Sequence, residues 1–360
     1  MKKTGLYIHF PFCRRTCFYC HFFKKKHQPA FATLYLQNLA REFFLRRDPG
    51  LSIDTVYIGG GSPSLLTVQQ LRIIMAAAYQ NFLLPANAEI TLEANPEDIT
   101  KQQLKAFRNL GINRLSIGVQ SFQELDLRFL KRTHSAAQAV QAIAQARNAG
   151  FANISIDLII GLEIQTARSL ENNFRQIEKF MPPHLSVYIL EGVPFKQPPL
   201  GGVPRSENDD RDASLYFQAR QSLLAMGYQH YEVSNYCLPG KASRHNLKYW
   251  QNKPYIALGP SAAGFMDGRD YRNYSDLKKY YSALEQSKLP QTRTKQMDRA
   301  RRRIITGLRL LAGIPASVFK SFSAPTDFLL SEGFLVKRNR NLAVPPEKIL
   351  LLNEILGYFL

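Results

Sequence analysis

Short apolar runs, rich in β-branched and aromatic residues, alternate with longer stretches of helical periodicity through the first half of the chain. The runs that predict strands lie at 6–10, 55–61, 89–95, 114–121, 154–162 and 185–192. Helical stretches lie between them, for example at 31–47, 67–82 and 135–150. Because nearly every residue of these strand runs is apolar, we expect strands buried on both faces, as in a parallel sheet covered by helices. The pattern predicts an α/β fold whose strand–helix units form a partial (β/α)6, TIM-like barrel.

Polar and glycine residues gather just past the C-terminal ends of the predicted strands. They are the cysteines after the first strand, Gly59 to Ser62 after the second, Glu93 and Asn95 on the third, and Gln120 and Ser121 on the fourth. Barrel enzymes place their sites on this rim. The sequence therefore predicts one shared pocket there.

The second half of the chain begins with a segment at 191–211 that is rich in proline, glycine and charge, which predicts the end of the barrel. A helix at 212–227 and a strand at 228–236 follow. Near the C-terminus we expect a helix at 297–313, two strands around a basic turn at 334–344, and a final helix. The predicted domains are a barrel at 1–205, a mixed α/β extension at 206–290, and a small α+β, winged-helix-like domain at 291–360.

The charge balance is strongly basic, because 47 Lys and Arg stand against 28 Asp and Glu and give a formal charge of +19. Such a surface attracts polyanions, acidic lipid or a carboxylate-bearing ligand, and charge alone does not choose among them. The N-terminus lacks the features of a secretory signal, and no run reaches the roughly 18 apolar residues that span a bilayer. We therefore expect a cytoplasmic protein whose membrane contact, where it occurs, is peripheral.

The stretch CRRTCFYC places Cys13, Cys17 and Cys20 at C-x3-C-x2-C spacing, while Cys237 stands apart as an ordinary thiol. A structural zinc site is normally closed by four ligands, and the adjacency of His21 to Cys20 makes a tetrahedral arrangement awkward. A 4Fe-4S cluster held by three thiolates instead leaves one iron open to an exogenous ligand. The spacing favours a cluster over zinc, although zinc knuckles also use short cysteine-rich tracts.

The cysteine loop and the motifs after it resemble the radical S-adenosylmethionine superfamily. The motifs are YIHFPFCRRTCFYC, YIGGGSPSLL, LEANPE, SIGVQSF, LKRTH and IDLIIGL, in the order found in the branch that contains oxygen-independent coproporphyrinogen dehydrogenase and the HemW haem chaperones. The resemblance implies a partial barrel in which Cys13, Cys17 and Cys20 hold the 4Fe-4S cluster. It also implies that S-adenosylmethionine chelates the open iron and is cleaved to a 5′-deoxyadenosyl radical.

The same resemblance implies which residues bind S-adenosylmethionine: Tyr7, Tyr19, Gly60, Gly61, Ser62, Glu93, Gln120, Arg132 and Asp157. Their chemistry suits these roles, since glycines allow close backbone approach, an arginine forks onto a carboxylate, and carboxylates accept from hydroxyl or ammonium groups. Each of these residue types also has a common structural role. A run of glycines more often forms a turn, an Asp at a strand end more often caps the backbone, and an Arg more often carries a solvated surface charge.

Two features separate the branches. The dehydrogenases extend the cysteine motif by one further cysteine, where this chain has Phe22, and they carry a long segment before the cluster. The stretch HNLKYW resembles the H-N-x-x-Y-W motif of the haem chaperone group, which implies that His245 is an axial ligand of haem. An isolated His beside aromatic residues is otherwise usually packed and hydrogen-bonded. His21 and Ala263 depart from the group's pattern, which has Asp and His there.

The sequence therefore favours a haem chaperone that binds the cluster, S-adenosylmethionine and haem. Its expected partners are haem-accepting proteins and a reductant protein for the cluster, and no nucleic acid. The alternative is a radical enzyme that oxidatively decarboxylates coproporphyrinogen III in porphyrin biosynthesis. Which of the two applies, and hence whether the chain is an enzyme, is left open by the residues themselves.

Overall fold

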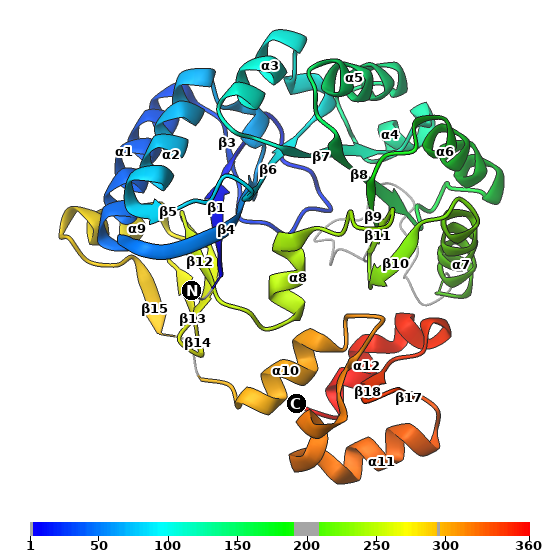
Figure 1. The fold of residues 1–360 in the computed structure, drawn as a ribbon. Coiled ribbons are helices and arrows are strands. Elements are labelled where there is room, and N and C mark those ends of the chain that lie inside the picture. The colour runs from blue at the N-terminus through cyan, green and yellow to red at the C-terminus, as the bar shows by residue number, and fades with distance from the viewer. Residues whose placement is uncertain (1–2, 191–208, 294–295) are drawn as a thin grey trace.

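The computed structural model describes residues 3–190, 209–293 and 296–360 (Figure 1). Its centre is a curved parallel sheet in which each strand pairs with the next along the chain. In order these strands are β1 (Thr4–Phe10), β4 (Asp48–Gly60), β6 (Glu89–Ala94), β7 (Arg114–Gln120), β8 (Asn153–Ile160) and β9 (His184–Ile189). The six predicted strand runs are confirmed, except that residues 191–192 of the last run lie outside the described residues.

Helices cover the outside of this sheet, as the periodicity predicted. They are α1 (Pro29–Leu45), α2 (Val68–Asn81), α3 (Lys101–Asn109), α4 (Glu124–Phe129), α5 (Ala136–Asn148) and α6 (Ala167–Phe180). Several begin at a capping box, in which a Ser or Thr side chain and the residue three positions later satisfy each other's backbone N–H groups. Thr67 starts α2, Ser135 starts α5 and Thr166 starts α6 in this way.

The strands are buried on both faces, as expected, but the inner face carries polar side chains. In β7, Leu115, Ile117 and Val119 join the core beneath the helices. The alternate residues Arg114, Ser116, Gly118 and Gln120 line the inside of the barrel. Successive side chains of a strand point to opposite faces, so a barrel with a ligand cavity has one apolar face and one polar face.

The segments after the barrel extend the same sheet at both edges. Beyond β1 come β12 (Tyr255–Leu258), which is parallel to β1, and then the antiparallel strands β13 (Ala263–Met266), β14 (Arg269–Asn273) and β15 (Gln291–Arg293). Beyond β9 come β11 (Asn235–Cys237) and β10 (Gln229–Glu232). The predicted single strand at 228–236 is therefore a hairpin, because the chain turns at Val233 and Ser234.

Three helices belong to these later segments: α7 (Asp209–Ala225), α8 (Arg244–Trp250) and α9 (Leu277–Glu285). Most of the segment 191–211, predicted to end the barrel, lies outside the described residues. Short elements complete the barrel region, namely β2 (Phe12–Cys13), β3 (Lys25–Lys26), β5 (Phe82–Leu83) and the 3₁₀ turns Pro63–Leu65 and Pro96–Asp98.

The C-terminal part is a small α+β module, as predicted, and lies below the barrel in Figure 1. It contains α10 (Arg299–Gly307), α11 (Ser323–Ser331), α12 (Leu352–Gly357), the 3₁₀ segments Ala316–Phe322 and Pro346–Leu351, and the antiparallel strands β16 (Ile314–Pro315), β18 (Asn341–Ala343) and β17 (Val336–Arg338). The strands β17 and β18 flank the basic turn.

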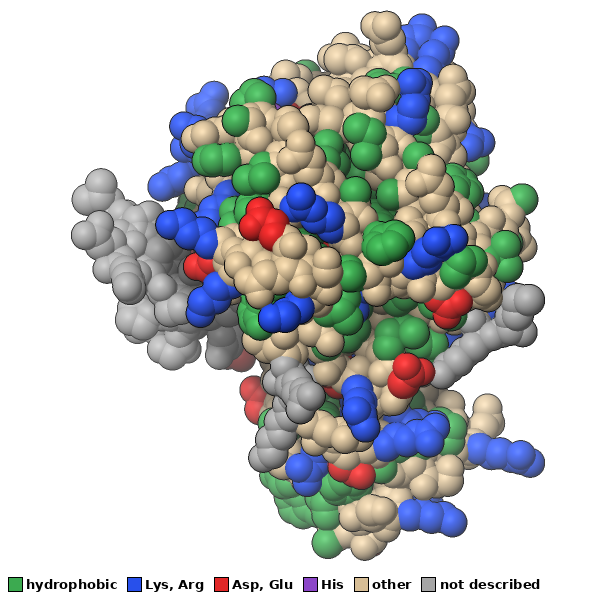
Figure 2. All heavy atoms as spheres, turned by 90° about the vertical axis from the view of Figure 1, so that its left-hand side faces the viewer, with side chains coloured by type: hydrophobic (Ala, Val, Ile, Leu, Met, Phe, Trp, Pro, Cys, Tyr) green, Lys and Arg blue, Asp and Glu red, His purple; other side chains and the backbone are tan. Residues whose placement is uncertain are grey.

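Figure 2 shows Lys and Arg side chains spread over one whole face of the molecule, with few Asp and Glu among them. The excess positive charge is distributed over this face and not gathered in one stripe. No helix within the described residues is both long and apolar enough to span a bilayer.

Candidate functional site

A cavity of about 440 Å³ opens at the C-terminal ends of the barrel strands. It is lined by almost every residue that the sequence singled out for the cluster and the cofactor: Cys13, Cys17, Cys20, Tyr19, Gly60, Gly61, Ser62, Glu93, Gln120, Arg132 and Asp157. The strands of the barrel thus bring together residues up to 144 positions apart, from Cys13 to Asp157. The predicted shared pocket is present.

The cysteine loop is held at its base by backbone hydrogen bonds. Strand β2 pairs with β3, so that the N–H of Lys25 donates to the carbonyl of Pro11 at 2.7 Å and the N–H of His27 donates to that of Cys13 at 2.8 Å. The ring of His9 contacts the carbonyl of Phe23 through Nε2 at 2.8 Å. The loop that carries the three thiols is therefore fixed to β1 on both sides.

The three thiols face one cavity without converging on one point. Within the described part of the chain, no three Cys, His, Asp or Glu side chains are arranged to hold a metal ion. A single Zn²⁺ needs each sulfur at about 2.3 Å from it. In a four-iron cluster each thiolate binds a different iron, so three thiols that face one cavity are compatible with a cluster.

The glycines after β4 are required by close packing against this loop. Gly60 has φ +111°, and a Cβ atom on it would lie 2.4 Å from the His9 ring. A Cβ atom on Gly61 would lie 2.6 Å from the carbonyl oxygen of Phe12, which accepts from the N–H of Ser62 at 2.8 Å. The motif GGGS is thus the place where the second barrel strand packs against β1 and the start of the cysteine loop, too closely for a side chain.

Glu93 lies on the inner face of β6 and is held by two donors. The hydroxyl of Tyr57 donates to its Oε1 at 2.8 Å, and the N–H of Gly60 donates to its Oε2 at 2.9 Å. Burial raises the pKa of Glu93 to about 7, although these two hydrogen bonds favour the charged form. The group therefore changes charge near neutral pH.

Gln120 and Asp157 complete the wall formed by β7 and β8. Gln120 has φ +66° and sits at an irregularity in the pairing of these strands. A left-handed conformation raises the conformational energy of a residue other than glycine. At an irregularity in strand pairing it changes the direction in which the side chain points. Asp157 accepts from the hydroxyl of Ser116 at 3.1 Å, and burial raises its pKa.

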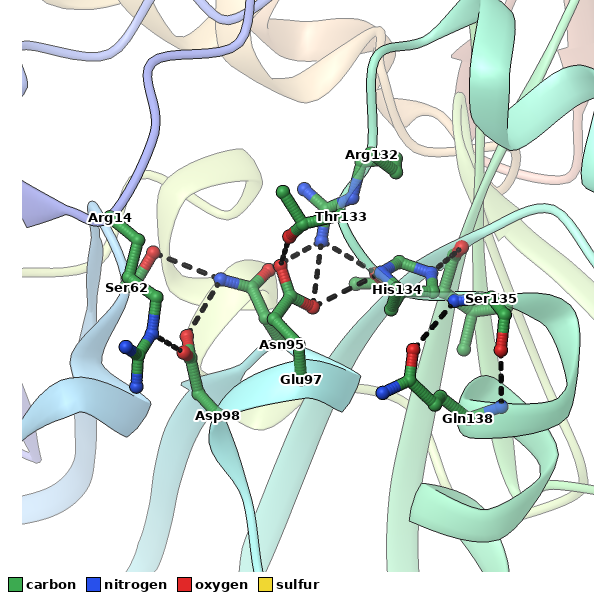
Figure 3. A network of polar contacts seen from close by, with 12 residues as sticks. Arg14, Ser62, Asn95, Glu97, Asp98, Arg132, Thr133, His134, Ser135 and Gln138 are labelled. Atoms are coloured by element: carbon green, nitrogen blue, oxygen red, sulfur yellow. Dashed lines mark hydrogen bonds and ion pairs between the residues drawn. The ribbon is translucent and has the colours of Figure 1, made fainter.

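Arg132 lies between the cysteine loop and the end of β6, and Figure 3 shows it beside Asn95 and Glu97. Its Nη1 lies 3.7 Å from the sulfur of Cys17, and its Nη2 donates to Oδ1 of Asn95 at 2.7 Å and to the carbonyl of Gly118 at 3.2 Å. Nη2 also lies 3.8 Å from Oε2 of Glu97. The guanidinium is therefore fixed beside one of the three thiols.

Glu97 holds the guanidinium of Arg132 in place by charge attraction. Burial alone would raise its pKa, but hydrogen bonds from His134 at 3.1 Å and Thr133 at 2.7 Å, together with the charge of Arg132, lower the pKa to about 2. The remaining ring nitrogen of His134 contacts the carbonyl of Val119 at 3.0 Å. Sequence reasoning gave these supporting residues no role, although Glu97 lies in LEANPE and His134 in LKRTH.

Two predicted residues do not line the cavity. Tyr7 lies beside it, with its hydroxyl 2.9 Å from Nδ1 of His9 and its ring 6.2 Å from that of Tyr57. His245 has no exposed surface. Its Nδ1 is 2.9 Å from the hydroxyl of Thr55, its Nε2 is 2.8 Å from that of Tyr249, and its ring stacks on Tyr57. In this arrangement neither ring nitrogen is free to ligate a haem iron.

His245 belongs to α8, which lies across the end of the barrel where the strands begin. The N–H of His245 donates to Oε1 of Glu89 at 3.0 Å, and Lys248 pairs with Asp54 at 2.6 Å. Burial lowers the pKa of His245 to about 3, so its imidazole is neutral. The neighbouring Asn246 lines the cavity, which therefore extends to the floor that α8 forms.

Comparison with known proteins gives the class and then the family. Residues 7–177 match the Radical SAM superfamily. Coproporphyrinogen III oxidase (HemN) from Escherichia coli, described as a radical SAM enzyme, has the same fold, with a TM-score of 0.87 and 23% identity over 99% of this chain and 90% of that one. The chain therefore contains a radical SAM domain.

Curated relatives are closer in sequence. "Heme chaperone HemW" of Haemophilus influenzae is 31% identical over 100% of this chain and 98% of its own length. The protein of that name from Bacillus subtilis is 30% identical over 98% of both chains, and that from Lactococcus lactis is 32% identical over 89% of this chain and 85% of its own. The chain belongs to the HemW family of the radical SAM superfamily.

Proposed function

We propose that this protein is a haem chaperone that binds a 4Fe-4S cluster, S-adenosylmethionine and haem, and delivers haem to acceptor haemoproteins. The observation that carries the proposal is the likeness to proteins named as haem chaperones along essentially the whole chain. The cavity adds support, because it holds three thiols together with donors and acceptors suited to an amino acid and a ribose. The acceptor proteins and a reductant protein for the cluster are part of the same proposal.

Cys13, Cys17 and Cys20 are the residues that would hold the cluster, which supplies an open iron and a one-electron reductant when bound. Arg132 would orient the carboxylate of S-adenosylmethionine, and the backbone around Gly60 and Gly61 would approach its amino group. Glu93, Gln120 and Asp157 would accept from or donate to its polar groups, while Tyr19 closes the cavity beside Cys17. These residues bind and orient the cofactor.

The charge of Glu93 predicts how cofactor binding depends on pH. S-adenosylmethionine is cationic, so it should bind better once Glu93 has lost its proton, which happens as pH rises through about 7. If only the carboxylate form binds well, affinity should increase about tenfold between about pH 6 and pH 8. Calorimetric titration of the anaerobically reconstituted protein measures this dependence. Glu93→Gln should bind more weakly with a flat profile; an equally steep profile in that variant would contradict the assignment.

Haem ligation by His245 stays a prediction, and it requires that the imidazole lose a protein partner. Tyr249→Phe removes the hydroxyl that occupies Nε2, so this variant should bind haem roughly three to ten times more tightly, as expected for one hydrogen bond. His245→Gln should shift or abolish the Soret band of the complex. Spectra recorded during haem titration test both variants, with Tyr358→Phe, on an exposed tyrosine, as the control. An unchanged band in His245→Gln would exclude the ligand.

A chaperone must also release its cargo, and this separates the proposal from catalysis. Haem bound to the reconstituted protein should move to an apo-globin added as acceptor, which visible spectra would follow. Phe22, where a dehydrogenase would carry its further cysteine, lines the cavity and is 61% exposed. Formation of a vinyl product from coproporphyrinogen III at catalytic turnover, in the presence of S-adenosylmethionine and reductant, would defeat the chaperone proposal.

A further inference from the structure

Arg114 is a buried cation without a counter-ion at contact distance. It is the first residue of β7, its side chain is 1% exposed, and it lines the cavity. Its Nε is buried and has no hydrogen-bond partner. Among the described residues, no ion pair within 4.0 Å reaches its guanidinium. An uncompensated buried charge is strongly unfavourable, so this arginine calls for a partner that the chain itself does not supply.

The two acidic groups of the cavity that Arg114 influences, Glu93 and Asp157, accept hydrogen bonds from other groups. Glu93 accepts from Tyr57 and from the N–H of Gly60, and Asp157 accepts from Ser116. Arg114 acts on both carboxyl groups only through longer-range attraction, and burial still raises the pKa of each. Both therefore hold a proton more readily than exposed carboxyl groups, which weakens them as counter-ions for the arginine.

Arg114 lies at the opposite end of the cavity from Arg132. The carbonyl of Gly118, which accepts from Arg132, is four residues further along β7, or about 13 Å at the rise of a strand. Arg132 thus lies at the end of the cavity that holds the cysteines, and Arg114 lies at its floor. The cavity lining also includes neutral polar side chains, namely Tyr57, Ser116, Ser186, Tyr188 and Asn246, beside the carboxyl groups of Glu93 and Asp157.

We propose that Arg114 anchors a carboxylate arm of a second ligand, which occupies the cavity beyond S-adenosylmethionine. Resting on the haem-carrier function proposed above, we infer that this arm is a propionate of haem. A guanidinium forks onto a carboxylate through two parallel hydrogen bonds, and the polar side chains around the floor accept the remaining contacts. Binding of the anion compensates the buried charge of Arg114.

The test compares haem with its dimethyl ester, in which both propionates are uncharged. Wild-type protein, reconstituted anaerobically, should bind haem at least roughly tenfold more tightly than the ester, as expected for a charge-assisted pair. Arg114→Met should bind haem only as well as the ester, and Arg114→Lys should fall between. Affinity for S-adenosylmethionine, measured at about pH 8 where Glu93 is charged, should fall much less than affinity for haem, because Arg132 takes its carboxylate.

The outcomes separate the two proposals. If the wild type binds no haem, the haem-carrier function fails, and the propionate assignment fails with it. If it binds haem and the ester equally, or if Arg114→Met weakens S-adenosylmethionine and leaves haem unaffected, the inference fails and the carrier function stands. The ester comparison on wild-type protein needs no variant to fold. Arg114→Met should melt within about 3 °C of wild type, since its buried Nε has no hydrogen-bond partner and its guanidinium has no ion pair within 4.0 Å to lose in the part of the chain that the structure describes. Arg175→Met, at an exposed position of α6, is the control.

Discussion

Replacing Cys17 with serine is expected to abolish iron binding while the chain stays folded. Cys17 is partly exposed in the loop, and the backbone bonds that fix the loop run through Pro11, Cys13 and His27, so its side chain contributes to the cluster and little to the fold. A cluster with three protein ligands has no thiolate to spare, and a hydroxyl is a poor replacement. Iron and sulfide counts after anaerobic reconstitution, with EPR of the reduced sample, measure the loss.

Cys237→Ser is the matched control, because this cysteine is buried in β11, away from the cavity. It should keep its iron, and Cys13→Ser and Cys20→Ser should lose theirs. Circular dichroism and the melting temperature show whether each variant is folded. A full complement of iron in Cys17→Ser, or zinc in wild-type protein purified without oxygen, would remove the basis for the cluster.

Arg132→Met is expected to weaken binding of S-adenosylmethionine by roughly ten- to a hundredfold without loss of iron. The guanidinium lies beside Cys17 and is held in place by Asn95 and Glu97, so it is preorganised to meet a carboxylate at the thiol end of the cavity. Loss of a charge-assisted hydrogen bond costs about 1.5–3 kcal/mol, which corresponds to that range of affinity. Calorimetry of the reconstituted variant measures it.

Arg132→Lys keeps the positive charge but lacks the two parallel N–H donors of the guanidinium. Its affinity for S-adenosylmethionine should therefore lie between those of the wild type and Arg132→Met. Arg128→Met, on an exposed position of α4, should bind like the wild type. Glu97→Gln supplies an independent check, since it loosens Arg132 without touching the ligand and should weaken binding less. Equal affinity in Arg132→Met and wild type would exclude the contact.

The strand–helix order could be predicted from the sequence because long apolar runs and capped helices are local signals. The polar interior was missed, although the signal is present: RLSIGVQ alternates polar or small residues with Leu115, Ile117 and Val119. That period of two indicates a strand with one apolar face. The prediction relied on the apolar residues and gave no role to Arg114, the first residue of the run.

The cavity residues could be predicted as a set because the motifs lie at strand ends, which a parallel barrel brings to one rim. The surroundings of His245 could not be predicted in this way. They depend on the docking of α8 against Thr55 and Glu89, which are 190 and 156 residues away in the chain. A motif identifies the residue, whereas its burial and its hydrogen-bond partners come from tertiary contacts that no local pattern encodes.

The pairing of β2 with β3 and the contact between His9 and Phe23 affect how the protein responds to oxygen. These bonds join protein groups to protein groups, so oxidation of the proposed cluster would remove iron from the thiols and leave the base of the loop folded. A molecule that had lost the proposed cluster would need iron and sulfide but no refolding, because the entropy of ordering the loop base was already lost when the chain folded. A protein with such a loop base could be repaired by rebuilding its cluster, so the chain would not have to be degraded and synthesised again.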